Sequence, residues 1–263
     1  MSIILAALDA GPTAQSVLET ALRIGELTNT AVEAVHVTTG DDQWVKSRSD
    51  RVHVPLHLLS GPLEPALLTA VDAPGVVAAV IGTKSAADDR RLVGRTAKHI
   101  IERSLKPAVI VPPELIADGP FRRLLIPLEG TETSTRPVLE VLMPLLAADV
   151  EFIVIHVFTE STAPAMLDHP WRDLQILGKE FLTQHLPNRE ARIELRHGPM
   201  GNQVAEACDE HGADLIVLSW SQDSTAGRAG VVRQVLGSVK LPILLLPLRG
   251  SGSIERGSDR SRN

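Results

Sequence analysis

The chain has one cysteine, Cys208, among its 263 residues. A single thiol cannot form an intramolecular disulfide, and it cannot supply the ligands of a thiolate-rich metal site. Cys208 lies in the helix-like segment QVAEACDEHG, where we expect a small buried core residue. The cysteine content therefore predicts neither a disulfide framework nor a metal centre built on sulfur.

Long apolar runs and an N-terminal targeting pattern are also missing. No uncharged apolar stretch reaches the roughly 18 residues that a membrane span requires. The start, MSIILAALD, has no basic residue before its apolar run, so we expect no signal peptide. The formal net charge of −6 gives no electrostatic reason to expect nucleic acid. We expect a cytoplasmic protein with neither a membrane partner nor a nucleic-acid partner.

Common catalytic motifs are absent as well: the chain has no GxxxxGK[ST], no GxSxG and no HExxH. Asp9 and Glu129 have the chemistry of general bases, but no nucleophile is paired with either. His36 and His156 end two similar strand-like runs, and we interpret them as packed histidines bonded to backbone. The sequence therefore predicts a protein that is not an enzyme and has no catalytic residues.

A metal site at two neighbouring histidines is not expected either. His53 and His57 lie in the extended segment HVPLHLL. Four residues along a strand span about 13 Å, which is too far for two side chains to share one ion. We predict no metal ligands in this chain.

The second half of the chain repeats the pattern of the first. Five segments recur in the same order, each an apolar run or a Gly-Pro pair before an apparent helix. The pairs are 3–11 with 123–131, 31–37 with 149–157, 59–71 with 196–208, 75–85 with 213–221, and 105–113 with 239–248. The strand-like runs do not alternate strictly, which is typical of parallel sheets covered on both faces. The sequence predicts two tandem α/β domains, each a doubly wound, mainly parallel sheet.

The two copies differ at one place. Residues 170–187, PWRDLQILGKEFLTQHLP, carry apolar side chains at three- and four-residue intervals, which predicts an amphipathic helix. The first copy has TGDDQWVKSRSDR there, which is typical of a polar loop. We expect the first domain to lack one helix that the second retains.

The predicted organisation has four parts. The first domain spans residues 1–113, a linker 114–121, the second domain 122–248 and a tail 249–263. The tail is polar and rich in glycine and serine, so we expect it to be disordered. The last strands of both copies are apolar and stand where a sheet edge is expected, which favours pairing with another strand.

Together these segments resemble the universal stress protein family in a tandem, two-domain form. The resemblance rests on AALDAG after the first strand, VHV ending the second, Gly-Pro before the third helix, and the proline-flanked last strand. It implies an adenine nucleotide alpha hydrolase-like fold and a stress-response protein that acts by binding. It also implies antiparallel pairing of the two last strands, which makes an intramolecular pseudo-dimer. A homodimer and an unidentified protein partner are further expectations.

In nucleotide-binding members of this family, an acid after strand one contacts the ribose side and a glycine-rich loop wraps the phosphates. Glycines let the backbone approach closely, and amides at a helix start meet anionic oxygens. The corresponding residues of the first domain are Asp9, Val37, Gly82, Ser85, Gly94, Arg95 and Thr96. The match is partial, because Ser85 replaces a glycine and Arg95 takes the hydroxyl position. ATP is the cofactor that this resemblance implies.

The second domain departs further from the pattern. Glu129 replaces the aspartate, Ser219 and Gln222 replace two glycines, and Val231 supplies no hydroxyl. These losses cost about 4 kcal/mol or more, enough to weaken a micromolar site to millimolar. We interpret the second domain as a non-binding copy. Two readings stay open for the protein: a degenerate ATP or AMP site in domain 1, or a nucleotide-independent interaction or scaffold protein. Slow ATP hydrolysis or autophosphorylation is a third reading with little sequence support.

Overall fold

The computed structural model of the chain describes most of both copies of the repeat. The described residues are 2–38, 40, 42–83, 94–113, 115, 119–128, 149–158, 191–220 and 228–247. Ser85, Glu129, Gln222, the predicted helix at 170–187 and the tail lie outside them. Within the described residues, no helix combines the length and the apolar character needed to cross a membrane.

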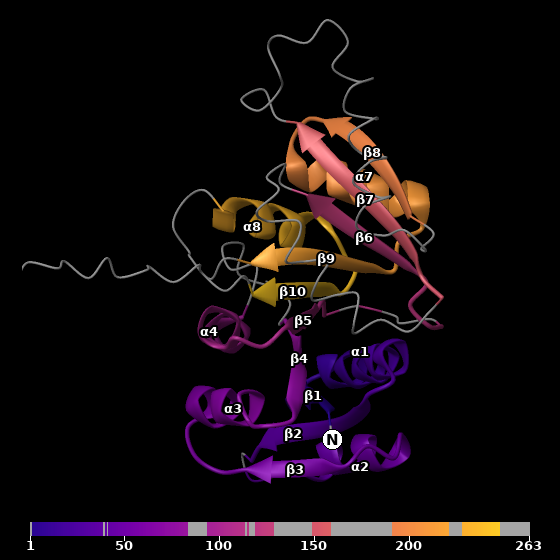
Figure 1. Cartoon of the computed structure of the whole chain (residues 1–263). Helices are drawn as coiled ribbons and strands as arrows, with labels where there is room; N and C mark the ends of the chain where they lie inside the picture. Colours follow the sequence, from indigo (N-terminus) through magenta and orange to yellow (C-terminus); the bar gives the residue numbers. More distant parts are fainter. Residues whose placement is uncertain are drawn as a thin grey trace, which may run out of the picture.

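Strands and helices alternate along the described chain (Figure 1). In the first half they are β1 Ile3–Ala7, α1 Thr13–Thr28, β2 Ala31–Val37, α2 Gln43–Arg51, β3 Leu56–Leu59, α3 Leu63–Val71, β4 Val76–Gly82, α4 Arg95–Arg103 and β5 Ala108–Val111. In the second half they are β6 Arg123–Leu128, β7 Glu151–Phe158, β8 Ala191–His197, α7 Met200–His211, β9 Leu215–Trp220, α8 Arg228–Ser238 and β10 Ile243–Pro247.

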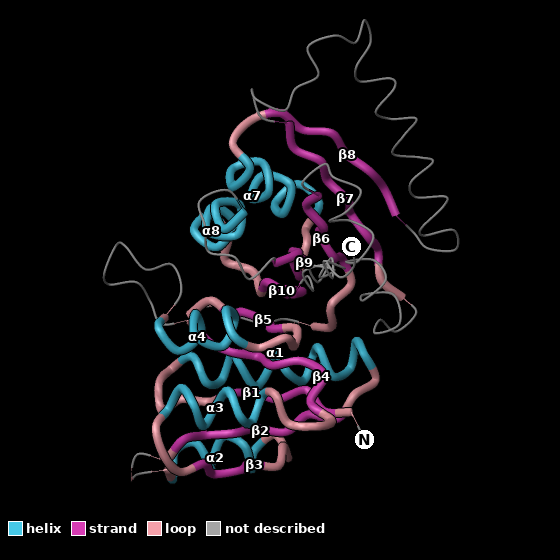
Figure 2. The backbone as a smooth tube through the Cα atoms, turned by 60° about the vertical axis from the view of Figure 1, so that its left-hand side comes forward, coloured by secondary structure: helices cyan, strands magenta, loops and turns pink. Residues whose placement is uncertain are grey.

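The strands form one continuous sheet in the order β3-β2-β1-β4-β5-β10-β9-β6-β7-β8. Neighbouring strands within each half are parallel, as the alternation of strands and helices predicts. In each half the strand order reverses direction once, between β1 and β4 and between β6 and β9. Figure 2 shows the strands of the two halves succeeding one another along the molecule.

The two halves meet where β5 pairs with β10. This pair is antiparallel, with Val109 opposite Leu244. The prediction that the two apolar last strands pair with each other is therefore confirmed. Each strand satisfies the edge hydrogen bonds of the other, so neither apolar strand ends the sheet.

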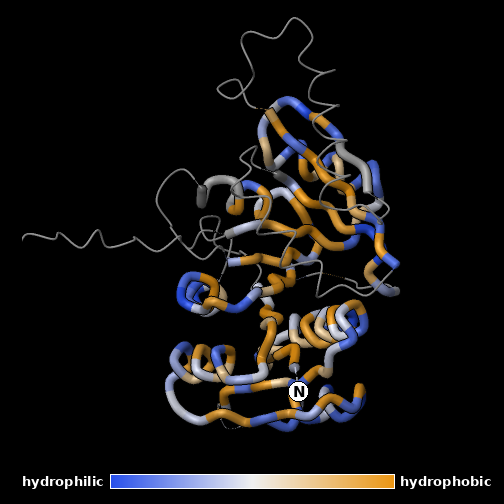
Figure 3. The backbone as a smooth tube through the Cα atoms, viewed as in Figure 1, coloured by the Kyte–Doolittle hydropathy of each residue, from blue (hydrophilic) through white to orange (hydrophobic). Residues whose placement is uncertain are grey.

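Helices cover both faces of the first half. Alternate residues of β1 point to opposite faces: Ile4 packs with α1 and α2, whereas Leu5 packs with α3 and α4. The core on the α1 side continues across the seam to Phe152 of β7 and Leu244 of β10. Figure 3 shows the hydrophobic residues gathered along the strands of both halves.

The first domain does not lack its second helix, and the prediction of a loop there was wrong. Residues Gln43–Arg51 form α2. Val45 and Ser49, four residues apart, are fully buried, and the Arg48 guanidinium lies 3.9 Å from the ring centroid of Trp44. Arg48 also donates to Gln15 of α1 at 2.9 Å. Tertiary packing stabilises this short helix, because its sequence alone has little apolar periodicity.

Candidate functional site

The candidate site lies at the carboxyl edge of the first half of the sheet. β1 is parallel to both β2 and β4, so the three strands end at the same edge. The strand order turns from 3-2-1 to 4-5 between β1 and β4. In open α/β sheets, ligands bind beyond the carboxyl ends of the strands at such a switch point. Asp9 follows β1 and Gly82 ends β4, so both lie beside it.

Asp9 has a local structural role. Its Oδ1 accepts the backbone N–H of Gly11 at 2.9 Å and lies 3.5 Å from the Thr13 hydroxyl oxygen. These contacts fix the turn that leads into α1, whose own N-cap residue, Pro12, makes no side-chain hydrogen bond. The carboxylate is half-buried and has capacity for further donors, because each oxygen has two lone pairs.

Gly82 is closely packed against α1. A Cβ at this position would lie 3.1 Å from Val17 Cγ2 and 3.3 Å from Thr13 Cβ. The first turn of α1 therefore rests directly on the end of β4. Thr13 is buried and contacts both Asp9 and the position of Gly82. Sequence reasoning missed Thr13, although its place four residues after Asp9 in LDAGPT was a usable signal.

The segment Gly94–Thr96 begins α4. Gly94 is its N-cap residue, with φ of −57°, so no left-handed backbone demands a glycine here. The Arg95 side chain is 81% exposed, and its Nε lies 2.8 Å from Oε1 of Glu64 in the first turn of α3. Thr96 is half-buried. The predicted phosphate loop between Gly82 and Gly94 is not described, so Ser85 is not placed.

The end of β2 is buried. Val37 packs in the core on the α3 and α4 side. His36 donates from Nδ1 to the Leu8 carbonyl at 2.9 Å, and its Nε2 lies 3.3 Å from Asp42 Oδ1. The interpretation of His36 as a packed histidine bonded to backbone is confirmed. His156, at the matching position of β7, makes an edge contact with the Phe158 ring at 4.3 Å.

The family model described as the universal stress protein family matches residues 120–247. The second half of the chain therefore carries a universal stress protein domain.

Solved structures extend the likeness over both halves. A universal stress protein from Archaeoglobus fulgidus DSM 4304 aligns with a TM-score of 0.65 at 14% identity, covering 93% of this chain and 98% of that one. A functionally unknown protein from Pseudomonas aeruginosa PAO1 aligns with a TM-score of 0.69 at 11% identity, covering 94% and 92%. At these identities the match shows the fold, here the tandem form. A search of curated protein sequences finds no match.

The second half of the chain has its own carboxyl edge, at the ends of β6, β7 and β9. Ser219 and Trp220 end β9, at the place where the first half has Gly82. Gly230 and Val231 lie inside α8, which begins at Arg228. Glu129 and Gln222, the other substituted positions, are not among the described residues.

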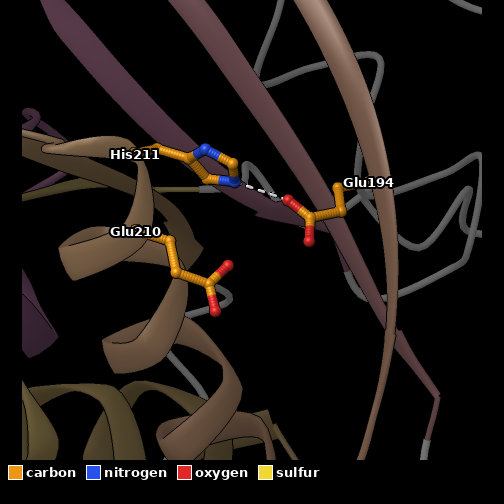
Figure 4. A group of neighbouring side chains, drawn as sticks. All are labelled: Glu194, Glu210 and His211. Carbon is orange, nitrogen blue, oxygen red and sulfur yellow. Dashed lines mark hydrogen bonds and ion pairs between the residues drawn. The ribbon is translucent and has the colours of Figure 1, made fainter.

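A group of ionisable side chains links the outer strand β8 to α7 (Figure 4). His211 Nε2 lies 2.5 Å from Glu194 Oε2, and Arg196 Nη2 lies 2.8 Å from Glu194 Oε1 and also pairs with Glu210. One ligand atom each from Glu194, Glu210 and His211 lies within 4.8 Å of the others, a spacing that a metal ion can bridge. The Arg196 side chain is 6% exposed and already places a cation between the carboxylates. We therefore assign an ionic link between strand and helix.

Two other features lie apart from the candidate site. Cys208 is buried in α7, where burial raises the pKa of its thiol to about 12, which agrees with a core role. A shallow groove, bordered by Gly25, Asn29 and Val54, opens at the amino edge of the first half. Ligands of parallel α/β sheets bind at the opposite edge, so this groove is not the candidate site.

Proposed function

We propose that the first half binds an adenine nucleotide, ATP or AMP, at the carboxyl edge of its sheet, and that the protein acts by binding rather than by catalysis. One observation carries the proposal. Thr13 touches both Asp9 and the close packing point at Gly82, so the two best-matched family positions share one side chain at the switch point. This arrangement supports the assignment of Asp9 and Gly82 to one site.

Charge orients the nucleotide in this proposal. Asp9 stands just before α1 and repels phosphate from that helix start, while its remaining lone pairs suit a ribose hydroxyl. The nine-residue α4 has no acid in its first turn and begins at Gly94, so its free amides favour the phosphates. Arg95 adds a positive charge at the same place. Ribose is expected near β1 and phosphates near α4.

The second half is proposed to be a non-binding copy. β9 ends in Ser219 and Trp220 where β4 ends in Gly82, and neither residue type allows the close backbone approach that a glycine gives. One nucleotide per chain is therefore expected, not two.

A nucleotide-independent scaffold is the second candidate function. It is favoured by the fact that charged groups at the carboxyl edge of the first half of the sheet already have partners within the protein. Arg95 pairs with Glu64, and Asp9 holds Gly11 and Thr13. A ligand must compete with these contacts. In this reading these contacts serve only to stabilise the fold, and the protein works through an unidentified protein partner.

Nucleotide titration separates the two functions. Protein purified without added nucleotide is denatured and its supernatant analysed for adenine nucleotides, and native protein is titrated calorimetrically with ATP, ADP and AMP. One nucleotide per chain is the expected stoichiometry. Absence of binding up to millimolar concentrations would establish the scaffold reading. Transfer or release of label from γ-labelled ATP would overturn the non-catalytic part of the proposal.

Variants locate the site. Asp9→Asn keeps an acceptor oxygen for Gly11 but removes the charge, so it should weaken binding with little change in stability. Gly94→Val introduces no backbone strain, because φ of −57° suits any residue. It should block approach of the phosphates and weaken ATP more than adenosine. Asp72→Asn, a carboxylate bonded to the Ser104 hydroxyl beyond the other end of α3, is the matched control. If all three variants bind like the parent protein, the site lies elsewhere.

A further inference from the structure

β3 forms one end of the ten-stranded sheet, and β8 forms the other. Figures 1 and 2 show β3 at the end of the first half that lies farthest from the seam. Among the described residues, only β2 pairs with β3, so the outer side of β3 has no strand partner there. The unpaired backbone groups of such a side are a template for another strand.

The hydrogen bonds of β3 show which of its residues face outward. The carbonyls of Pro55 and Leu59 accept amide hydrogens from β2 and from the residue that follows it. Backbone groups alternate in direction along a strand, so His57 also faces β2, whereas the N–H and C=O groups of Leu56 and Leu58 face outward. Pro55 belongs to the set that faces β2, so its missing N–H does not block the outer side.

The side chains of β3 do not protect this edge. Its sequence is LHLL, without an acid, a lysine or an arginine. Leu58 is 42% exposed, and Leu56, on the same face of the sheet, is half-buried. The strand at the other end differs, because β8 carries Arg192, Glu194 and Arg196 at alternate positions. Charges of this kind keep an edge from associating, so β3 is the edge that suits another strand.

The seam shows that strands this short already hold two units together in this protein. β5 has four residues, all apolar, and it pairs with β10 at three positions. β3 has the same length as β5, and three of its residues are leucines. An antiparallel contact between two short apolar strands is therefore a geometry that this fold already uses.

We propose that the outer edge of β3 binds a second copy of this chain, and that the two β3 strands pair antiparallel about a twofold axis. The outward groups fix the register. Leu56 of one copy lies opposite Leu58 of the other, and each such pair exchanges two backbone hydrogen bonds. His57 lies opposite His57 of the second copy, and the leucines of both strands share one face of the extended sheet.

Symmetry and charge favour this arrangement over head-to-tail addition. The twofold contact uses the same surface on both copies, so it closes as a dimer. Pairing β3 with β8 of another copy would instead bring leucines against a charged strand and would build an open chain of molecules. At the axis, each His57 brings its own carboxylate, since its Nε2 lies 2.8 Å from Oε2 of Glu33. No uncompensated pair of like charges arises there.

The contact is small, so we expect a weak dimer. Stable interfaces bury about 1,200–2,000 Å² in total, and a contact built on two four-residue strands falls at or below the low end. We therefore expect a dissociation constant of about 10–100 μM. The dimer does not depend on nucleotide binding, so its tests use protein without nucleotide.

Sedimentation of the full chain tests the dimer. Between about 5 μM and 0.5 mM the parent protein should pass from monomer towards dimer. Leu58→Lys places a charge on the edge and should raise the dissociation constant by about tenfold or more. Leu105→Lys makes the same change at a 59% exposed residue outside β3 and should leave the constant unchanged. A parent protein that stays monomeric, which would leave β3 to a different partner, overturns the proposal, as do equal effects of the two variants.

A proline variant separates strand pairing from contact between side chains alone. Leu58→Ala and Leu58→Pro both remove the leucine, but only proline also removes the outward N–H. Pairing with β2 should persist in both, because that N–H does not bond to β2, and circular dichroism checks that each variant is folded. Leu58→Pro should weaken the dimer by about fivefold or more beyond Leu58→Ala, since both copies lose a donor. Equal weakening would mean that the strands do not pair.

Disulfide trapping tests the register. His57 occupies a non-hydrogen-bonded position in the proposed pair, where opposite Cα atoms lie about 4.5 Å apart, within reach of a disulfide. His57→Cys should therefore form a covalent dimer under mild oxidation, seen on a non-reducing gel. Leu105→Cys should stay monomeric, and the native Cys208 is buried. If His57→Cys forms no more covalent dimer than Leu105→Cys, the β3 contact is refuted, and any dimer seen by sedimentation uses another surface.

Discussion

The guanidinium of Arg23 lies 3.7 Å above the ring of Phe121. Arg23 belongs to α1, and Phe121 stands just before β6, so this contact ties the first half to the beginning of the second. The Phe121 side chain is also buried in the core that runs across both halves. The segment between the two copies is thus anchored by an aromatic residue, in addition to the β5–β10 seam.

Replacing Phe121 by alanine should therefore destabilise the whole protein. We expect the free energy of unfolding to fall by about 3–5 kcal/mol, because a buried ring is lost and a cavity remains. Phe121→Leu should cost less, since most of the apolar volume stays. Urea unfolding at pH 7 measures both. Leu105→Ala, at a 59% exposed residue, should change stability by less than about 0.5 kcal/mol. Equal losses for Phe121→Ala and Leu105→Ala would contradict the anchor.

Asp214 should make stability depend on acid pH. Burial raises the pKa of its carboxyl above 3.8, although the amides of Arg122 and Arg123 and the charge of Arg23 oppose the shift. A raised folded-state pKa means that stability is fully present below about pH 4 and is lost as pH rises through the folded pKa. The parent protein should therefore lose stability relative to Asp214→Asn from pH 4 to 7.

Denaturant titrations at several pH values across this range check the prediction, with Asp209→Asn on the exposed side of α7 as control. A stability difference between the parent protein and Asp214→Asn that grows in the opposite direction would mean that the hydrogen bonds outweigh burial.

The ionic link at β8 depends on Arg196. Arg196→Met should lower the free energy of unfolding by about 1.5–3 kcal/mol, because Glu194 loses its buried charged partner, while Glu210, which is 57% exposed, stays hydrated. Thermal unfolding with and without added zinc tests the assignment further. Zinc should leave the parent protein unchanged, since Arg196 occupies the cation position. A zinc-dependent rise in the parent protein's melting temperature would make this group a metal site.

Helix α2, which contains the buried residue Val45, shows which parts of the fold the sequence could predict and which it could not. The strands and their parallel pairing followed from the repeat, because apolar runs with both faces covered leave a clear pattern. The second helix did not, since α2 has only Trp44 and Val45 as apolar residues and depends on α1 for its packing. Val45→Ala should therefore cost about 2 kcal/mol, whereas the neighbouring exposed Lys46→Ala should cost little. Loss of helical circular dichroism signal should accompany the first change only.

The candidate site was predictable in part for a related reason. Asp9 and Gly82 could be aligned with a family pattern, but the sequence did not reveal that α1 itself uses both. Thr13 and Val17 pack closely against Gly82, and the Asp9 carboxylate accepts the Gly11 amide. Residue identity at such positions serves packing as well as the proposed binding. The structure shows the packing contacts of these residues, and nucleotide titration tests whether they also bind a ligand.

The pairing of Val109 with Leu244 should make the two halves unfold together. Both residues belong to one core that also holds Leu18 of α1 and Phe152 of β7, so a cavity at the seam weakens contacts on each side. Leu244→Ala should lower the free energy of unfolding by about 2–5 kcal/mol. Native-state hydrogen exchange should then show equal loss of protection in the amides of β1 and β7. If only the amides of β6, β7 and β9 exchange faster, the halves are separate folding units joined at the seam. Equal acceleration in β1 would instead show that the shared core, rather than each copy of the repeat, is the cooperative unit.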